Sequence, residues 1–594
     1  MKQRWSCLAV SALTVLAVSG LVNIYQLSDR IYYNRGVLSV VVFALAMVMA
    51  EKLFQGYKEN PRAAFWACLC AGLLNGAELM GLGMRLFANY VPVRLSGFHI
   101  VWMMISAVIL IPFTEPVIYW LLTVRMMPER EPVRCQRIFF ASWLIIFLLF
   151  LPCFFAFYPG LYNYDMTWQW EMYDTGVYST HHPLIHTFLT GSLFELGNRL
   201  WGSYNAGFAL HSILQLVVLS GCMAYGIRYL VKRRMPKKVW IAVLIFYGIF
   251  PFFPVLGVST TKDTVFGGLF LVTFVSICDM VQDLRIWRGW RLGGFILAAV
   301  LMGAFRNNAV YGLACSMICF LLAAVSMGIQ KKVEIRRFLL QLSLLLFIIC
   351  AGTQLSLSGM KQALHASDGS VAEMLSVPMQ QLARTGLYYE NELTADEKKK
   401  LDEYFGEGNY YNYKYYVSDP VKMNFRVDRF EENPKAFFRF WLEMGKKHPG
   451  EYLLATLYNT QGLWYLGGDS SAYLSYKMFP STYVWQDSRL PALRDFYCWF
   501  TNLNLERYLP LISMIFYTSF YSWSVLIGGV ALIVKRRYTM LIPVMVLLPY
   551  MATLVLGPCM IVRYMLGVML CVPILWAEIV VASDSAPLDI QRAE

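Results

Sequence analysis

The sequence predicts an all-α integral membrane protein with about 14 transmembrane helices and one mostly helical domain outside the membrane. Of its 594 residues, 58% are hydrophobic and 15% are charged, whereas a soluble chain is nearer half apolar and a quarter charged. An aromatic content of 16% excludes a disordered chain. Since apolar segments of spanning length recur along the chain, a multi-pass membrane protein is the class that remains.

The apolar segments fall into two groups, which are separated by a long polar stretch. The predicted spans are 6–26, 36–54, 63–84, 100–124, 137–157, 206–229, 238–258, 263–283, 292–305, 309–329, 337–357, 509–534, 539–556 and 559–581. Another segment, 183–201, carries His186, Glu195 and Arg199 and is a poorer span. We expect it to lie along the outer surface, or to enter the membrane and return on the same side.

Basic residues indicate how the spans are oriented. Lys and Arg cluster in the loops 125–137, 232–238, 285–291, 331–337 and 535–537. Loops of this kind usually face the cytoplasm. All of them do so, with both termini cytoplasmic, if the stretch 183–229 crosses the membrane once. Most of the basic residues that give the net charge of +13 therefore indicate the orientation of the spans. We expect no nucleic acid partner, because no basic folded face is apparent.

The topology divides the chain into four parts. These are N-terminal transmembrane helices at 1–136, a transmembrane module at 137–357 with an outer loop at 158–182, an extracytoplasmic domain at 358–508, and C-terminal transmembrane helices at 509–594. The extracytoplasmic domain carries a net charge of −2 from 17 basic and 19 acidic residues. Helical patterns at 371–386, 394–405, 433–447 and 450–460 predict that it is mostly helical.

Ionisable side chains from five segments fall at one depth near the predicted outer membrane surface. They are Asp165 in the outer loop, His181 and His182 at the end of that loop, Lys262 and Asp263 at the start of a span, Arg306 between two spans, and Arg563 near the outer end of the last span. Such groups are costly near hydrocarbon unless they are paired, hydrated or bound to a ligand. Their conjunction therefore favours a functional site.

The chemistry of a lipid-linked sugar donor suits these residue types. The donor carries phosphate at the membrane face, which Lys262, Arg306, Arg384 and Arg563 could hold as cations. The acceptor needs a general base, for which Asp165 is the candidate. Sugars stack on aromatic faces, and the outer loop contains Tyr162, Tyr164, Trp168 and Trp170.

Each residue also has a structural interpretation that the sequence leaves open. Asp165 and Asp263 could cap the helices that follow them. Lys262 could extend its chain toward the interface, and Arg306 could pair with any nearby carboxylate. Two adjacent histidines do not by themselves make a metal site.

The outer loop resembles that of the GT-C superfamily of integral-membrane glycosyltransferases. Asp165 and the later His182-Pro183 correspond to an essential acidic residue and a His-Pro element there. From about residue 137 the chain resembles, more closely, an uncharacterised bacterial multi-spanning membrane family of GT-C likeness. The motifs that carry this resemblance are Tyr158-Pro159-Gly160 with Asp165, His181-His182-Pro183-Leu184 with His186-Thr187, Thr261-Lys262-Asp263, Arg306-Asn307-Asn308, Ser376 to Arg384, His448-Pro449 with Tyr452, and Arg563-Tyr564.

The resemblance implies a GT-C-like helical bundle in a bacterial plasma membrane, with a polyprenyl-phosphate-linked sugar as donor. It implies an envelope glycan or lipid as acceptor, and membrane lipids as further partners. It adds Asn307, Asn308 and Gln380 to the substrate-binding candidates. A divalent cation cofactor stays open, because Met166 stands where many members have a second acidic residue.

The sequence leaves three functions open. The first is a glycosyltransferase that acts outside the cytoplasm. The second is a transporter, flippase or polymerase of lipid-linked glycans, which would place charged residues along a path through the membrane. The third is a receptor or scaffold, which would not need Asp165, Lys262 and Arg306 to meet in space.

Overall fold

The structure is a computed structural model that describes residues 2–25, 37–88, 97–129, 134–467, 481–501 and 510–581. Residues 26, 36 and 509, at the ends of three predicted spans, lie outside these ranges, as do 468–480 and 502–508 of the predicted extracytoplasmic domain. The regular structure of the described residues is helical, and no strand occurs among them. The all-α prediction is therefore confirmed.

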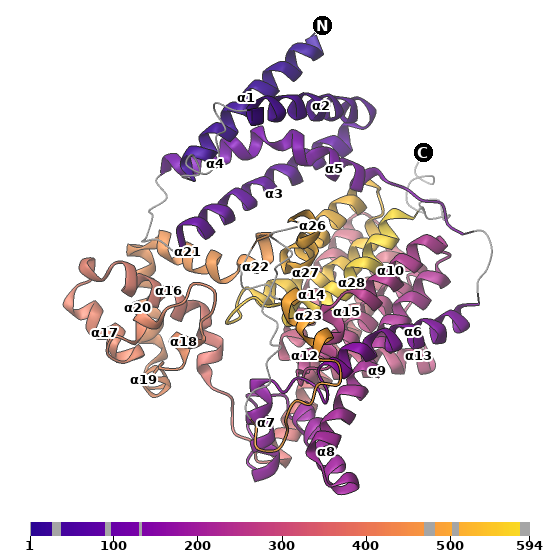
Figure 1. The fold of residues 1–594 in the computed structure, drawn as a ribbon, viewed down its shortest axis with the longest axis vertical. Coiled ribbons are helices and arrows are strands. Elements are labelled where there is room, and N and C mark those ends of the chain that lie inside the picture. Colours follow the sequence, from indigo (N-terminus) through magenta and orange to yellow (C-terminus); the bar gives the residue numbers. More distant parts are fainter. Residues whose placement is uncertain are drawn as a thin grey trace.

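Five N-terminal helices lie together at one end of the molecule, at the top of Figure 1. They are α1 (Lys2–Ile24), α2 (Val37–Glu59), α3 (Pro61–Ala88), α4 (Gly97–Ile109) and α5 (Ile111–Thr123). The predicted span 100–124 is bent by 53° between α4 and α5. Pro112, in the first turn of α5, has no N–H to continue the α4 hydrogen-bond ladder, so the helix breaks there.

The largest group of helices follows. It comprises α6 (Cys135–Ala156), α7 (Tyr164–Thr175), α8 (Leu184–Trp201), α9 (Tyr204–Lys232), α10 (Lys237–Ile249), α11 (Phe252–Gly257), α12 (Lys262–Asp283), α13 (Gly289–Phe305), α14 (Asn307–Ile329) and α15 (Val333–Ala363). The C-terminal helices α26 (Thr518–Val534), α27 (Leu541–Leu554) and α28 (Val562–Val580) pack into this group. Most of it lies on the right of Figure 1.

Nine helices in the described residues are long and apolar enough to cross a membrane, or ten if α4 and α5 form one broken span. This fits a multi-pass membrane protein. The other predicted spans correspond to shorter helices, namely α13, α26, α27 and the pair α10 and α11, which is interrupted at Pro251. α8 is not among the nine and packs beside α9, consistent with its polar residues.

The middle of the bundle is formed by α12 and α28. In an apolar 18-residue stretch of each of these two helices 89% and 83% of the residues are buried, whereas the corresponding stretches of the other long apolar helices reach 50% at most. Helices that are apolar on all sides are expected at such a position. Each has a residue that the sequence singled out in its first turn, Lys262 in α12 and Arg563 in α28, so the most enclosed part of the fold leads directly to the candidate site.

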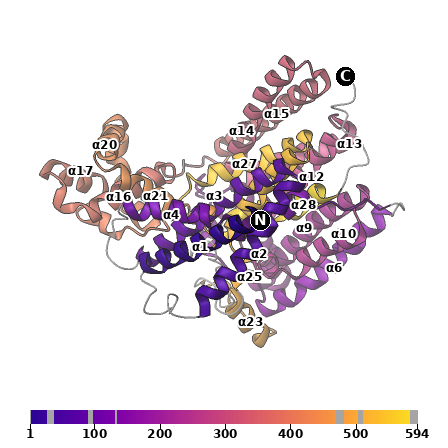
Figure 2. The same ribbon diagram turned by 90° about the horizontal axis from the view of Figure 1, so that it is seen from above.

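The polar middle of the chain folds around a separate hydrophobic core that includes Leu382, Phe405 and Phe437. Its helices are α16 (Ser376–Tyr388), α17 (Ala395–Phe405), α18 (Asp419–Lys422), α19 (Val427–Glu432), α20 (Pro434–Lys447), α21 (Pro449–Asn459) and α22 (Gln461–Trp464). The helical patterns read from the sequence coincide with α16, α17, α20 and α21. Figures 1 and 2 show α17 and α20 well away from α6, α9 and α10.

Described segments near both ends of the predicted extracytoplasmic domain pack with the bundle. At one end, α15 continues to Ala363, past the expected boundary at residue 357. At the other end, α23 (Pro491–Thr501) packs on α6. The backbone N–H groups of Asp487 and Arg489 donate to the carbonyls of Tyr158 and Phe155, at 2.8 and 2.9 Å. The separately packed unit is therefore smaller than 358–508.

Candidate functional site

A short backbone pairing places the start of α7 beside the start of α12. Leu161 N–H donates to the Val258 carbonyl at 2.8 Å, and Thr260 N–H donates to the Leu161 carbonyl at 3.0 Å. The Asn163 N–H then donates to Thr260 Oγ1 at 2.9 Å. These bonds fix the segment before Asp165 against the segment before Lys262, although the two are nearly 100 residues apart in the sequence.

The turn before this pairing requires a glycine. Gly160 has a φ of +152°, and a Cβ atom there would lie 2.4 Å from Ser212 Oγ and 2.6 Å from the Phe208 ring on α9. Only glycine allows this backbone conformation and this close approach together. The Tyr158-Pro159-Gly160 motif therefore has a direct structural role in seating the loop on α9.

Four charged side chains from four segments form a buried chain of ion pairs, which we call the ion-pair cluster: Asp165, Arg563, Asp263 and Arg306. Arg563 Nη1 donates to Asp165 Oδ2 at 2.9 Å, and Arg563 Nε lies 3.6 Å from Asp263 Oδ2. Arg306 Nη1 donates to Asp263 Oδ1. All four side chains are less than 10% exposed. Charges buried this deeply must be paired, and these pairs alternate in sign.

Aromatic rings complete the cluster. Tyr164 Oη accepts a hydrogen bond from Arg563 Nη2 at 2.9 Å. The guanidinium carbons of Arg306 and Arg563 lie 4.1 and 5.3 Å from the ring centroid of Tyr564. Tyr564 was not predicted as a site residue, although its place directly after Arg563 was a signal that could have identified it.

Lys262 adds a third cation that has no carboxylate of its own. In the described part of the chain its ammonium group makes no hydrogen bond or ion pair, and the side chain is partly buried. The positive charge of Lys262 interacts electrostatically with the Asp165 carboxylate, but that carboxylate is already paired with Arg563. Lys262, Arg306 and Arg563 thus face only two carboxylates, so the site carries a net positive charge.

His182 borders the same site. It is 5% exposed, and both of its ring nitrogens lack a hydrogen-bond partner among the described residues. Burial, reinforced by the charge of Lys262, lowers the pKa of His182 to about 3. The neutral ring therefore offers one donor and one acceptor that no described protein group uses.

The neighbouring charges keep Asp165 ionised. Burial alone would raise the pKa of its carboxyl group, but the charges of Arg563 and Lys262, together with the hydrogen bond from Arg563, hold that pKa well below its usual value. Asp165 lies within the first turn of α7, and Asn163 caps that helix. The capping interpretation of Asp165 is therefore wrong, and Thr261 likewise replaces Asp263 as the cap of α12.

The N-termini of four helices meet at the cluster. α7 begins at Tyr164, α12 at Lys262, α14 directly after Arg306, and α28 one residue before Arg563. Helix N-termini carry partial positive charge and free N–H groups, which favour anions. Four such ends and a surplus lysine therefore favour an anion at this position.

The remaining predicted residues lie in two places. His181 is exposed and its ring is 4.7 Å from that of His182, while Asn307 is exposed and Asn308 partly buried in the first turn of α14. Gln380 donates to the Lys414 carbonyl at 3.1 Å, within the separately packed domain. Within the described ranges no hydrogen bond or ion pair joins Gln380 to the ion-pair cluster.

Arg384 also makes its contacts within the separately packed domain. Its Nε donates to Glu451 Oε2 at 2.7 Å, and its guanidinium lies 4.6 and 5.0 Å from the rings of Tyr388 and Tyr458. Burial opposes its charge, but Tyr413 and Glu451 raise the pKa of Arg384 above its usual value. No ion pair or hydrogen bond connects it to the cluster in the described residues.

No group of three or more His, Cys, Asp or Glu side chains in the described residues is placed to hold a metal ion. The two carboxylates of the ion-pair cluster are each engaged by arginine. A divalent cation would have to compete with those arginines.

The comparisons with known proteins give a family. No curated protein and no solved structure matches the chain. The profile of a family of unknown function (DUF6020) matches residues 170–589. This range contains His182, Lys262, Asp263, Arg306 and Arg563, and it begins shortly after Asp165. Because the match covers well over half of the sequence, the chain belongs to the DUF6020 family of unknown function.

Proposed function

We propose that the chain is an integral membrane glycosyltransferase. It transfers a sugar from a polyprenyl-phosphate-linked donor to a glycan or lipid acceptor of the cell envelope, on the extracytoplasmic side. The observation that carries this proposal is the convergence of Lys262, Arg306 and Arg563 with four helix N-termini around only two carboxylates. The surplus positive charge suits a phosphate that arrives with a substrate.

The donor phosphate would be held by the groups that the protein leaves without a full set of partners. These are the Lys262 ammonium and the ring of His182. Tyr164 and Tyr564 flank Arg563 and provide aromatic faces beside it. A leaving phosphate that develops charge in such a site is stabilised more in the transition state than in the ground state.

Asp165 is the proposed base. The acceptor hydroxyl gives its proton to the Asp165 carboxylate while its oxygen forms a bond to the anomeric carbon of the sugar. The bond from that carbon to the phosphate oxygen breaks, and the electron pair leaves with the polyprenyl phosphate. While Arg563 holds Asp165 its pKa is low and it is a weak base; a donor phosphate that binds Arg563 would restore its basicity.

The centre of α12 favours a glycosyltransferase that acts on one side of the membrane over the alternative of a transporter, flippase or polymerase. Between Asp263 and Asp279 the helix contains no charged residue, and it is the most buried span of the bundle. A path for a charged glycan lipid would need polar groups along that length.

The proposal includes a finer architecture. If the shorter apolar helices α13, α26, α27 and the broken pairs α4–α5 and α10–α11 also cross, the chain has about 14 spans. It then forms a GT-C-like bundle in a bacterial plasma membrane, with both termini cytoplasmic. The ends of α7, α12, α14 and α28 that meet at the cluster lie on the outer face.

The experiment is an assay of the purified full chain in proteoliposomes with a panel of polyprenyl-phosphate sugars, scored for sugar transfer or donor hydrolysis. We expect one donor to be consumed by the wild type and Asp165→Asn to lower the rate by about 100-fold or more, as loss of a general base does. The matched control is Asp174→Asn, an exposed carboxylate on the same helix α7, which should retain the wild-type rate.

Two results would contradict the proposal. If no donor is consumed by folded wild-type protein, the glycosyltransferase function fails. If a donor is consumed and Asp165→Asn keeps the wild-type rate, the function stands but Asp165 is not the base.

A further inference from the structure

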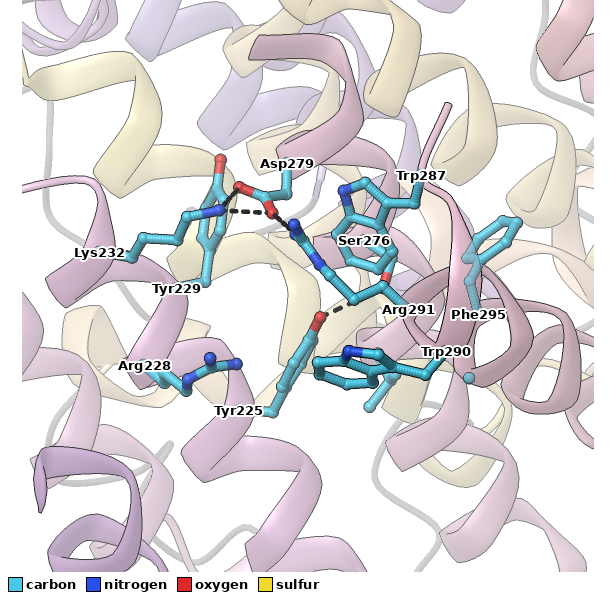
Figure 3. Close-up of a pocket in the computed structure, with 12 residues that line it drawn as sticks. Tyr225, Arg228, Tyr229, Lys232, Ser276, Asp279, Trp287, Trp290, Arg291 and Phe295 are labelled. Carbon is cyan, nitrogen blue, oxygen red and sulfur yellow. Dashed lines mark hydrogen bonds and ion pairs between the residues drawn. The ribbon is translucent and has the colours of Figure 1, made fainter. Parts of the chain in front are cut away.

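A second charged site lies at the other end of α12. A cavity of about 340 Å³ opens between α9, α12 and α13 (Figure 3). Its polar lining includes Arg228, Lys232, Asp279 and Arg291. Asp263 and Asp279 are 16 positions apart on one helix, so the cavity is roughly 24 Å from the ion-pair cluster along the axis of α12.

One carboxylate is shared by two cations in this cavity. Lys232 Nζ lies 2.7 Å from each oxygen of Asp279, and Arg291 Nη2 lies 2.7 Å from Oδ2. The single negative charge of Asp279 neutralises only one of the two positive charges of Lys232 and Arg291. The lining is therefore positive even before Arg228 is counted.

Arg228 increases that surplus. Its side chain is partly buried, and its Nε is buried without a hydrogen-bond partner among the described residues. In Figure 3 it lies beside Tyr225 with no dashed line to any neighbour. A guanidinium placed at a cavity without an acceptor is suited to an anionic group that enters from outside.

Aromatic side chains of the kind found at a membrane boundary lie at this cavity. Trp290 is 83% exposed at the start of α13, and Trp287 lies under the guanidinium of Arg291 at 4.1 Å. Tryptophan with lysine and arginine is typical of the headgroup level of a bilayer. Below this level the lining becomes apolar at Val272 and Phe295.

We infer that this cavity binds the phosphate of an anionic phospholipid headgroup, with Arg228 as its principal contact. Basic pockets between transmembrane helices on the cytoplasmic side recognise such headgroups, and the charge pattern of the sequence predicts that this end of α12 is cytoplasmic. Lys232 and Arg291 supply the surrounding positive charge, and the apolar floor at Phe295 meets the first acyl carbons.

The chain offers a matched pair of variants to test the site. Gly293 and Gly294 are neighbours on α13, and a Cβ atom at either would meet no other atom within 4 Å. Gly294 lines the cavity and Gly293 does not. Gly294→Leu should therefore fill the cavity. Gly293→Leu is the control, because it changes the helix propensity of α13 in the same way at a position that does not line the cavity.

The experiment is native mass spectrometry of the full chain in detergent, titrated with phosphatidylglycerol, with phosphatidylcholine, and separately with inorganic phosphate. We expect the wild type to bind phosphatidylglycerol more tightly than phosphatidylcholine. We expect Arg228→Gln to weaken phosphatidylglycerol binding about fivefold, as removal of one cation near a membrane surface does. Gly294→Leu should weaken it at least as much, and Gly293→Leu should bind as the wild type does.

The phosphate arm identifies the source of the anion. If inorganic phosphate binds alone and its binding is lost in Arg228→Gln, the site takes a free phosphate and the lipid assignment is overturned. If phosphatidylglycerol binds more tightly than phosphatidylcholine while inorganic phosphate neither binds nor competes, the site takes the lipid. Equal binding of both lipids by the wild type, with no binding of phosphate, would overturn the inference. So would unchanged phosphatidylglycerol binding in Arg228→Gln, a variant that decides the question even if Gly294→Leu fails to fold.

Discussion

The two ends of α12 hold charged clusters of similar composition in different surroundings. At the end that begins with Lys262, the Asp263 side chain is 0% exposed and its partner Arg306 is 9% exposed. At the other end, Asp279 is 10% exposed, but Lys232 and Arg291 are 48% and 42% exposed. Each end has more cations than carboxylates. The difference is how much solvent screens them.

That difference separates the consequences of breaking each cluster. A buried charge that loses its partner keeps its desolvation cost, so its removal is felt by the whole fold. A half-exposed lysine or arginine is solvated again when its partner is removed. The ion pairs at the buried end should therefore contribute to the stability of the fold, while those at the open end should be broken at little cost to stability.

The largest expected effect is at Asp263. Asp263→Ala leaves Arg306 buried without its carboxylate and should lower the free energy of unfolding by about 3–5 kcal/mol. The measurement is denaturant unfolding in detergent, followed by tryptophan fluorescence. Asp283→Ala removes an exposed carboxylate from the end of the same helix and is the control. Equal stability of the two variants would show that the ion-pair cluster contributes little to the fold.

A smaller effect is expected from His182 as pH falls. The folded protein keeps His182 neutral down to a pKa of about 3, whereas an unfolded chain protonates histidine near pH 6.5. Between these values the unfolded state binds more protons, so stability decreases as pH falls, by up to about 1.4 kcal/mol per pH unit. His182→Asn should remove this contribution, so its stability should decrease less steeply than that of the wild type between pH 6.5 and 5, as measured by unfolding at each pH.

The control for that experiment is His365→Asn, which removes an exposed histidine. A wild-type curve that runs parallel to that of His182→Asn over the same pH range would contradict a buried, neutral His182.

The smallest effect is expected at the open end of α12. Asp279→Ala should lower the free energy of unfolding by about 1 kcal/mol or less, because Lys232 and Arg291 regain water. Unfolding under the same conditions as for Asp263→Ala checks this. A loss as large as that of Asp263→Ala would remove the distinction between the two ends.

Much of the helical layout could be predicted from the sequence, because apolar run length and helix periodicity are local properties. Each predicted span has a helix or a broken helix in the structure. Breaks such as the one at Pro251 were not predicted, since a proline inside an apolar run does not reveal whether the helix bends or ends. The end of α15 beyond residue 357 was missed for a related reason, because polar residues can extend a helix past the membrane.

The candidate site could be predicted only as a set of residues. Burial cost near hydrocarbon singled out Asp165, Lys262, Asp263, Arg306 and Arg563, and the structure brings these together. The partner of each one depends on long-range packing, which the sequence does not reveal. Arg384 shows the consequence: a cation predicted to hold substrate is paired with Glu451 inside another core. The cavity at Arg228 was missed because the basic loops were interpreted only as a sign of topology.

The most direct test of the central claim is the affinity of the full chain for polyprenyl monophosphate, which carries the proposed phosphate without a sugar. Lys262 has no carboxylate of its own, so Lys262→Gln should leave the fold intact. It should weaken binding about tenfold or more, the effect of losing one charged hydrogen bond. Lys435→Gln, at an exposed lysine of α20, should bind as the wild type does. Wild-type affinity in Lys262→Gln would contradict a phosphate site at the ion-pair cluster.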